Sequence, residues 1–108
     1  SIPILGICYG AQLLAHLCGS KIIEIDGHVK KRHKVFSEDS SVRFVNSYHN
    51  YAIKEINPKK IQPIYYDNKK NIECFNLKNK NVLGIMWHPE RNKVFDNSDI
   101  KMVRSLCI

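Results

Sequence analysis

The chain has 108 residues, 44% of them hydrophobic and 25% charged, which is ordinary for a globular domain. No apolar run approaches the length of a membrane-spanning helix. The net charge is +7, but few aromatic residues interleave with the basic ones, so nucleic-acid binding is not indicated. The four cysteines (Cys8, Cys18, Cys74 and Cys107) form no CxxC pair, which excludes a zinc ribbon and gives no disulfide framework.

The chain opens on a short apolar run that ends in a cysteine. Ile2 to Ile7 is predicted to form a buried strand, and Cys8 follows it directly. A helix is then indicated by leucines at helical spacing and a glycine stop: Leu13, Leu14, Leu17 and Gly19. Gly6 and Gly10 let the backbone bend and pack closely around the turn. This is the pattern of a nucleophile elbow built on cysteine, and the helix N-terminus is expected to favour the thiolate.

The middle of the chain alternates short apolar runs with polar turns. Strands are predicted over residues 21–25, 42–46, 61–66 and 71–77, and the run 51–56 leads to a turn at Asn57-Pro58. The basic cluster His28–Lys34 follows an Asp26-Gly27 turn and is interpreted as a loop, either solvated or bordering a site for an anionic substrate. His28 and His33 have no cysteine or carboxylate at ligand spacing along the chain, so no metal site is predicted.

A second chemical motif comes late in the chain. A strand-like run from Val82 to Trp87 leads into His88-Pro89-Glu90. His88 and Glu90 are two residues apart, so their side chains point the same way in extended backbone. A carboxylate on one imidazole nitrogen sets the tautomer and leaves the other nitrogen for a thiol. The order Cys8, His88, Glu90 fits a triad assembled at two strand ends of one sheet. A last helix is predicted from Asn97 or Ser98.

Three motifs together resemble the class I glutamine amidotransferases. They are P-I-L-G-I-C-Y-G-A-Q-L-L at residues 3–14, V-N-S-Y-H-N at residues 45–50 and G-I-M-W-H-P-E at residues 84–90. The middle motif is similar to that of the γ-glutamyl-γ-aminobutyrate hydrolase-like branch, and the elbow is also similar to the glutaminase domain of GMP synthetase. The resemblance implies an α/β domain of the flavodoxin-like, three-layer kind.

The resemblance also implies a role for each site residue. Cys8 attacks the side-chain amide carbon of glutamine or a γ-glutamyl compound, His88 carries the proton to the leaving nitrogen, and Glu90 orients His88. The resemblance further assigns one oxyanion donor, the backbone N–H of Tyr9, and three substrate contacts: Gln12 and the backbone around Asn50 and Tyr51. A γ-glutamyl thioester forms, ammonia or an amine departs, and water releases glutamate. Neither a cofactor nor a metal is expected.

The resemblance runs from the first residues to about Arg91. Members of the family have further strands before the elbow strand, and a glycine-rich loop among them supplies a second oxyanion donor. Residues 1–108 are therefore expected to be the C-terminal portion of one such domain. This portion alone is expected to be weakly active or inactive, since loss of an oxyanion donor costs about two to three orders of magnitude in rate.

Two alternatives to a self-sufficient hydrolase stay open. The chain could belong to an ammonia-donating glutaminase subunit of a separate synthetase, or it could be a truncated, non-catalytic amidotransferase-like module that acts only in assembly. The expected ligand is a small molecule, and the possible protein partner is a synthetase subunit. Binding to nucleic acid or to a membrane is not expected. A reactive Cys8 prefers a reducing compartment, so a cytoplasmic location is expected.

Overall fold

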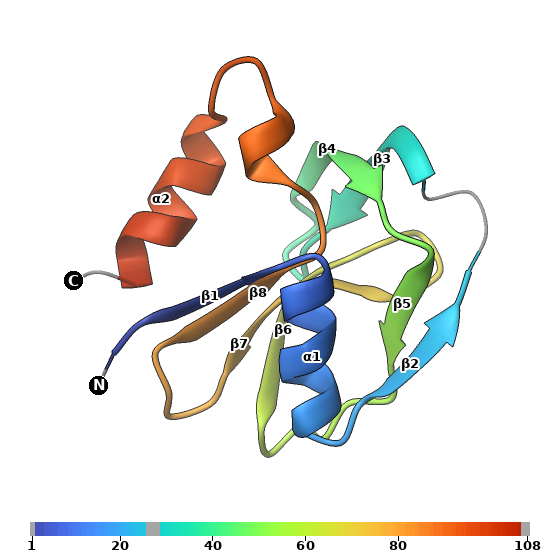
Figure 1. Ribbon diagram of the computed structural model, residues 1–108, viewed down its shortest axis with the longest axis vertical. Coiled ribbons are helices and arrows are strands. Elements are labelled where there is room, and N and C mark those ends of the chain that lie inside the picture. Colours follow the sequence, from blue (N-terminus) through green and yellow to red (C-terminus); the bar gives the residue numbers. More distant parts are fainter. Residues whose placement is uncertain (1, 26–28, 107–108) are drawn as a thin grey trace.

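The computed structural model describes residues 2–25 and 29–106 (Figure 1). In chain order the elements are β1 (Ile4–Ile7), α1 (Tyr9–Leu17), β2 (Lys21–Glu24), β3 (Val29–Phe36), β4 (Val42–Tyr48), β5 (Tyr51–Lys54), β6 (Ile61–Tyr66), β7 (Ile72–Leu77), β8 (Val82–Ile85), the 3₁₀ turn η1 (Pro89–Arg91) and α2 (Asn97–Leu106). Among the described residues, no helix is both long enough and apolar enough to cross a membrane.

The described strands form one curled sheet of mixed direction. Its main path runs β1-β8-β7-β6-β3-β4, and β2 joins through β5, which pairs with β7. β1 and β8 are parallel neighbours, with Ile7 opposite Ile85. Parallel neighbours end at the same edge of a sheet, so the residues that follow β1 and β8 emerge side by side. This pairing brings Cys8 and the segment that carries His88 to one edge.

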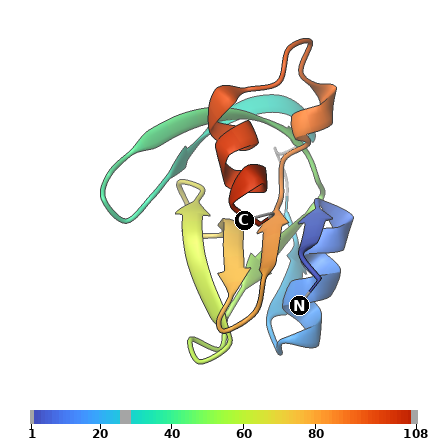
Figure 2. The same ribbon diagram turned by 90° about the vertical axis from the view of Figure 1, so that its left-hand side faces the viewer.

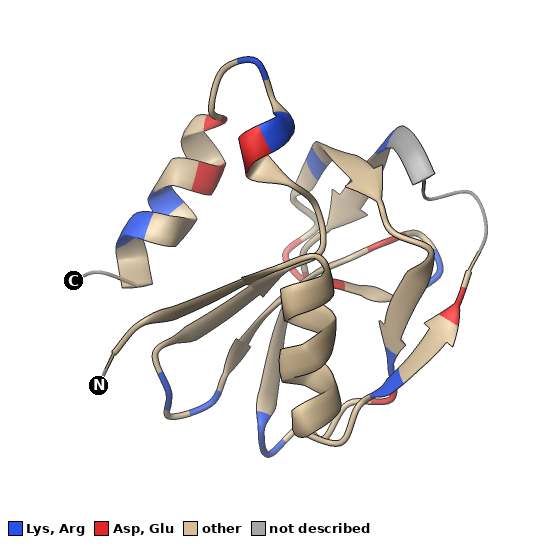
Figure 3. Cartoon of the chain, in the orientation of Figure 1, with Lys and Arg blue, Asp and Glu red and all other residues tan. Residues whose placement is uncertain are grey.

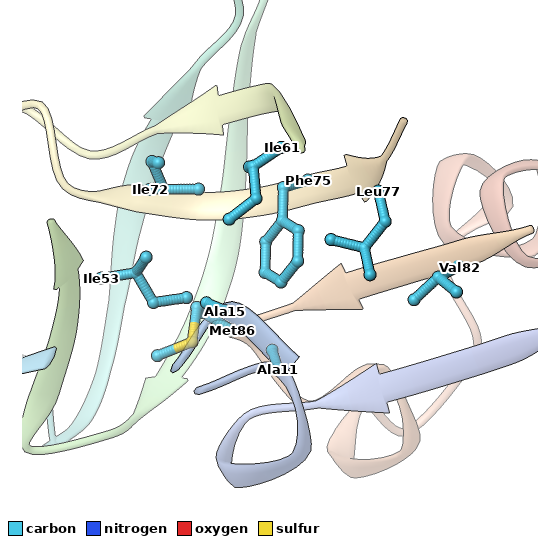
Figure 4. Packing of buried hydrophobic residues seen from close by; sticks show 9 residues of the cluster. All are labelled: Ala11, Ala15, Ile53, Ile61, Ile72, Phe75, Leu77, Val82 and Met86. Atoms are coloured by element: carbon cyan, nitrogen blue, oxygen red, sulfur yellow. The ribbon is translucent and has the colours of Figure 1, made fainter. Parts of the chain in front are cut away.

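Each face of the sheet carries its own apolar cluster. Successive side chains of β8 point to opposite faces of the sheet. Val82 therefore belongs to the cluster under α1, whereas Leu83 and Ile85 belong to the cluster under α2. Figure 2 shows the sheet passing between the two helices. The cluster under α1 is drawn in Figure 4, where the ring of Phe75 extends from β7 toward Ala11 and Ala15. The elbow cysteine therefore begins a helix that is packed directly on the sheet.

Two alanines and Leu14 form the sheet-facing side of α1, and the other two leucines do not. Ala11 and Ala15 are fully buried, whereas Leu13 and Leu17 are exposed. The reason is the close approach of the helix to β1: a Cβ on Gly6 would lie 2.6 Å from Cδ1 of Leu14 and 2.9 Å from the Gly10 carbonyl. Alanines are the side chains that permit this distance, because larger ones would force the helix away from the strand.

Gly6→Ala should therefore destabilise the protein, by about 1–3 kcal/mol, since overpacking a close helix–strand contact forces the backbone to shift. Urea denaturation measures the change. Gly10→Ala is the matched control: a Cβ there meets nothing within 4 Å, and alanine is the better helix former, so stability should stay equal or rise by up to about 1 kcal/mol. Equal effects of the two substitutions would contradict the close approach at Gly6.

The basic cluster forms a strand, so its interpretation as a loop is wrong. His28 lies outside the described residues, but the rest of the cluster belongs to β3, which pairs antiparallel with β4. Arg32 and Lys34 are exposed, whereas the adjoining Val35 is buried in the core. This alternation is the period-two pattern of a strand with charged residues on its solvent face. Figure 3 shows other basic residues at the hairpin turns and along α2.

An aspartate network anchors α2. Asp99 is 3% exposed and accepts hydrogen bonds from Nη2 of Arg43 on β4 at 2.8 Å and from Nε1 of Trp87 at 3.0 Å. Asp96 caps the N-terminus of α2, because its side chain accepts the Ser98 N–H at 2.8 Å, and the helix begins at the next residue. The predicted caps, Asn97 and Ser98, are thus wrong by one and two positions. Through Trp87, α2 is connected to the segment that carries His88.

Candidate active site

Cys8 occupies a strained turn between β1 and α1. Its φ of 53° and ψ of −102° lie in a region that non-glycine residues rarely adopt. Two backbone hydrogen bonds hold the turn: the Cys8 N–H donates to the Ile85 carbonyl at 2.6 Å, and the Gln12 N–H donates to the Cys8 carbonyl at 3.0 Å. Strained residues of this kind cost about 1–3 kcal/mol and gather at functional sites. The local geometry is that of a nucleophile elbow.

The electrostatic environment of Cys8 differs from the sequence-based expectation. Burial raises the pKa of the Cys8 thiol, and this effect outweighs the backbone N–H of Tyr9 and the positive charge of Arg91, which both lower it. The helix N-terminus does favour the thiolate, but desolvation is the larger influence. The raised pKa favours the thiol as the resting form, so nucleophilic attack needs a base to take its proton.

The base candidate is His88, which already has a carboxylate partner. Nδ1 of His88 lies 2.6 Å from Oε2 of Glu90, on the η1 turn that follows β8. Burial raises the pKa of the Glu90 carboxyl, but the hydrogen bond to His88, a backbone hydrogen bond and the positive charges nearby together outweigh burial and lower it overall. An ionised Glu90 accepts a hydrogen bond from Nδ1 of His88, which keeps the imidazole proton on Nδ1. Nε2 of the neutral ring is then the proton acceptor.

Asn46 fixes the backbone of His88, a contact that sequence reasoning missed. The Asn46 side chain donates to the His88 carbonyl at 2.7 Å and accepts the His88 N–H at 2.8 Å. Asn46 is 6% exposed and lies within β4, where asparagine is an unfavoured residue. That unfavourable placement was the available signal, because a polar residue inside a strand is expected to have a specific partner.

A pocket of about 420 Å³ joins the elbow to the turn between β4 and β5. It is lined by Cys8, Tyr9, Gln12, Ile22, Tyr48, His49, Asn50 and Tyr51. The structure thus brings five of the residues predicted for the site to one cavity. His88 contacts this wall through Tyr48, whose ring lies edge-on to the imidazole at 5.7 Å between centroids. The guanidinium of Arg91 also stacks on Tyr48, 4.3 Å from the ring centroid.

A buried carboxylate stands behind the pocket wall. Glu73 of β7 is 1% exposed, with Oε1 at 3.2 Å from Nε2 of His33 and Oε2 at 3.3 Å from Nε2 of His49. Burial raises the pKa of Glu73, but its two histidines outweigh burial and lower it. Burial lowers the pKa of His49, but Glu73, the Tyr51 carbonyl and Asp67 together outweigh burial and raise it. Among the described residues, these three are grouped closely enough to hold a metal ion.

The fold and these motifs define an amidotransferase-type enzyme domain, and comparison with known proteins identifies its family. Residues 1–101 match the profile of the family Glutamine amidotransferase class-I. The chain therefore belongs to the class I glutamine amidotransferases. It is 37% identical over 99 residues to the γ-glutamyl-CDP-amidate hydrolase of Campylobacter jejuni, covering 92% of this chain and 48% of that protein.

A second relative supports the same family, and two solved structures support the fold. The glutamine-hydrolysing GMP synthase of Streptococcus pyogenes is 32% identical over 112 residues, covering 93% of this chain and 21% of that protein. A Thermoplasma acidophilum protein assigned to the GMP synthases superposes with a TM-score of 0.80 at 21% identity, covering 96% of this chain and 55% of that one. A Thermotoga maritima glutamine amidotransferase gives 0.70 at 20% identity, with coverages of 95% and 47%. The flavodoxin-like α/β fold is confirmed, and the chain spans about half or less of the relatives it matches.

Proposed function

We propose that the protein containing this chain hydrolyses a γ-glutamyl amide through a thioester on Cys8. The single observation that carries this proposal is the convergence of two elements at one sheet edge: the strained cysteine turn after β1 and the hydrogen-bonded His88–Glu90 pair after the neighbouring parallel strand β8. A thiol, an imidazole and an orienting carboxylate are the three groups that acyl transfer by a cysteine nucleophile requires.

The proposed reaction uses Cys8, His88 and Glu90 in turn. As Sγ of Cys8 bonds to the amide carbon, its proton passes to Nε2 of His88, and Glu90 stabilises the resulting imidazolium. The Tyr9 N–H donates to the oxyanion. Collapse of the tetrahedral intermediate breaks the carbon–nitrogen bond, and the departing amine takes the proton from His88. Water, deprotonated by His88, then attacks the thioester and releases glutamate and the free thiol.

The pocket suggests how substrate is held. Gln12 is 6% exposed and lines the cavity beside Cys8, where it is placed to contact the γ-glutamyl group. Asn50 and Tyr51 line the same cavity, where their backbone is placed to meet the α-amino-acid end. Arg91, stacked on Tyr48, brings a positive charge to the wall of this cavity. We infer that this arginine receives an anionic leaving group, a chemistry compatible with the substrate for which the Campylobacter jejuni relative is named.

Arg91→Gln tests this assignment. For a phosphate-bearing γ-glutamyl amide, KM should rise by about ten- to a hundredfold, because a charge-assisted hydrogen bond contributes about 1.5–3 kcal/mol. For glutamine, KM should be unchanged. The control is Lys101→Gln, an exposed cation of α2 that lines neither the Cys8 pocket nor the cavity beside Glu90. A uniform loss on both substrates, or no loss on either, would refute a role for Arg91 in selecting the leaving group.

A glutaminase subunit that feeds ammonia to a synthetase is the second candidate. It is favoured by the similarity to glutamine-hydrolysing GMP synthase, of which the chain covers 21%. The two functions differ in where the nitrogen goes. A self-sufficient hydrolase releases glutamate from a γ-glutamyl conjugate at full rate by itself, whereas a glutaminase subunit hydrolyses glutamine slowly until its partner and acceptor are added. Glutamate release measured with and without a candidate synthetase separates them.

The raised pKa of Cys8 gives a pH prediction. Since burial disfavours the thiolate, the alkylation rate of Cys8 by iodoacetamide should keep rising with pH through about pH 9 and not level off near neutrality. Quantitative mass spectrometry of the Cys8 peptide measures the rate at each pH. A plateau below about pH 7 would show a preformed thiolate–imidazolium pair and would contradict the thiol resting state.

A further inference from the structure

The cluster behind the pocket gathers its side chains from three separate parts of the sheet. His33 comes from β3, Glu73 from β7 and His49 from the turn between β4 and β5. Their potential ligand atoms all lie within 4.8 Å of one another, and the two histidine–carboxylate distances are 3.2 and 3.3 Å. Ligand atoms around a tetrahedral Zn²⁺ are about 3.3 Å apart, given metal–ligand bonds of roughly 2.0–2.1 Å. The two histidine nitrogens lie at about that distance from different oxygens of Glu73, Oε1 for His33 and Oε2 for His49, so both carboxylate oxygens face the cluster.

The orientation of His49 is that of a metal-binding imidazole. Its Nδ1 lies 2.7 Å from the Tyr51 carbonyl, which can only accept, so Nδ1 carries a proton and donates it. The nitrogen that faces Glu73 is therefore Nε2, whose lone pair is directed at a carboxylate oxygen whenever the ring is neutral. Metal-ligating histidines commonly donate their other N–H to a backbone carbonyl in this way, which fixes ring and tautomer.

Burial makes a cation between these groups favourable. Glu73 and His49 are 1% and 2% exposed, and a buried carboxylate is costly unless a positive charge compensates it. A proton on an imidazole is one such charge. A divalent ion is the other, and two imidazoles with one carboxylate are a donor set that suits Zn²⁺ and neighbouring first-row metals.

We propose that His33, His49 and Glu73 bind one Zn²⁺ or a similar divalent transition-metal ion. The ion sits behind the pocket wall and not in the reaction path. It ties β3 and β7 to the turn that carries Asn50 and Tyr51, and so holds the substrate side of the pocket in place. This proposal does not depend on the proposed hydrolysis, because none of the three residues takes part in the proposed reaction steps.

Metal binding is measured directly on the purified protein after chelator treatment and dialysis. With Zn²⁺, isothermal titration calorimetry should give one site per chain. With Co²⁺, visible spectra should show weak ligand-field bands without the near-ultraviolet thiolate charge-transfer band, since the site contains no cysteine. The melting temperature should rise with added Zn²⁺, because an ion that binds only the folded state stabilises it by mass action.

Three variants decide the assignment. Glu73→Gln keeps the side-chain shape and should lower Zn²⁺ affinity at least tenfold, and His33→Gln, at a half-buried position, should do the same with less risk to folding. His16→Gln, an exposed histidine of α1, should change nothing. Circular dichroism confirms that each variant is folded, and if Glu73→Gln is not, His33→Gln decides. Absence of stoichiometric binding, a thiolate band with Co²⁺, or equal affinity in His33→Gln and the parent would overturn the proposal.

Discussion

Cys8→Ala should lower γ-glutamyl hydrolysis by at least about four orders of magnitude, because removing the nucleophile of a triad leaves only binding and oxyanion stabilisation. The loss should appear in kcat, with KM little changed, since the thiol acts in bond formation and not in substrate recognition. Steady-state assays of glutamate release measure both constants. Alanine also removes the steric volume of Sγ from a pocket lined by Tyr9 and Gln12, so substrate binding itself should survive.

Cys18→Ala is the matched control for this variant. Cys18 follows α1 directly and is half-buried, but it lies outside the pocket that contains Cys8. Its replacement should leave kcat within about twofold of the parent, as for most substitutions away from functional features. Retention of a tenth or more of the activity by Cys8→Ala would exclude the thioester route, whatever the behaviour of the control.

Asp99→Ala should lower the free energy of unfolding by about 3–5 kcal/mol, because it removes the hydrogen-bond acceptor of a partly buried guanidinium and of a buried indole N–H. Arg43 loses the partner at 2.8 Å, and Trp87, which is 1% exposed, loses the acceptor at 3.0 Å from its Nε1. These groups remain between α2 and the sheet, where water reaches them poorly. Urea denaturation followed by Trp87 fluorescence measures the change.

Asp96→Ala provides the comparison, since Asp96 contacts the same guanidinium at 3.1 Å with a side chain that is 47% exposed. That ion pair is largely solvated and contributes little, so the expected loss is about 1 kcal/mol, chiefly from the helix cap. The difference between the two aspartates isolates the effect of burial. If both variants lost the same stability, the network around Asp99 would not be the anchor of α2.

Local patterns predicted much of the fold. The strand over residues 61–66 has the predicted bounds, and the strands into Cys8 and His88 are present but shorter, at Ile4–Ile7 and Val82–Ile85. Apolar runs and turn residues carry this information because they act over a few neighbouring positions. The basic segment at β3 was misinterpreted because charge dominated its composition. Only the pairing with β4 shows that its charges alternate with buried positions.

The candidate site was predictable where its signal is contiguous in sequence. The elbow around Cys8 and the His88–Glu90 spacing are short motifs. The Asn46 clamp and the Glu73 cluster join residues tens of positions apart. No spacing rule connects them, because their meeting depends on sheet order. The direction of the Cys8 pKa also needed the structure, since burial and not the helix terminus decides it.

The most direct test of the proposed chemistry is covalent labelling with a diazo-ketone analogue of glutamine, mapped by tandem mass spectrometry. The proposal predicts one adduct, on Cys8, that glutamine or a γ-glutamyl substrate protects against and that forms much more slowly in His88→Asn. Labelling of Cys18 or Cys74 in place of Cys8, or an unchanged rate without the imidazole, would mean that sulfur and base do not act together.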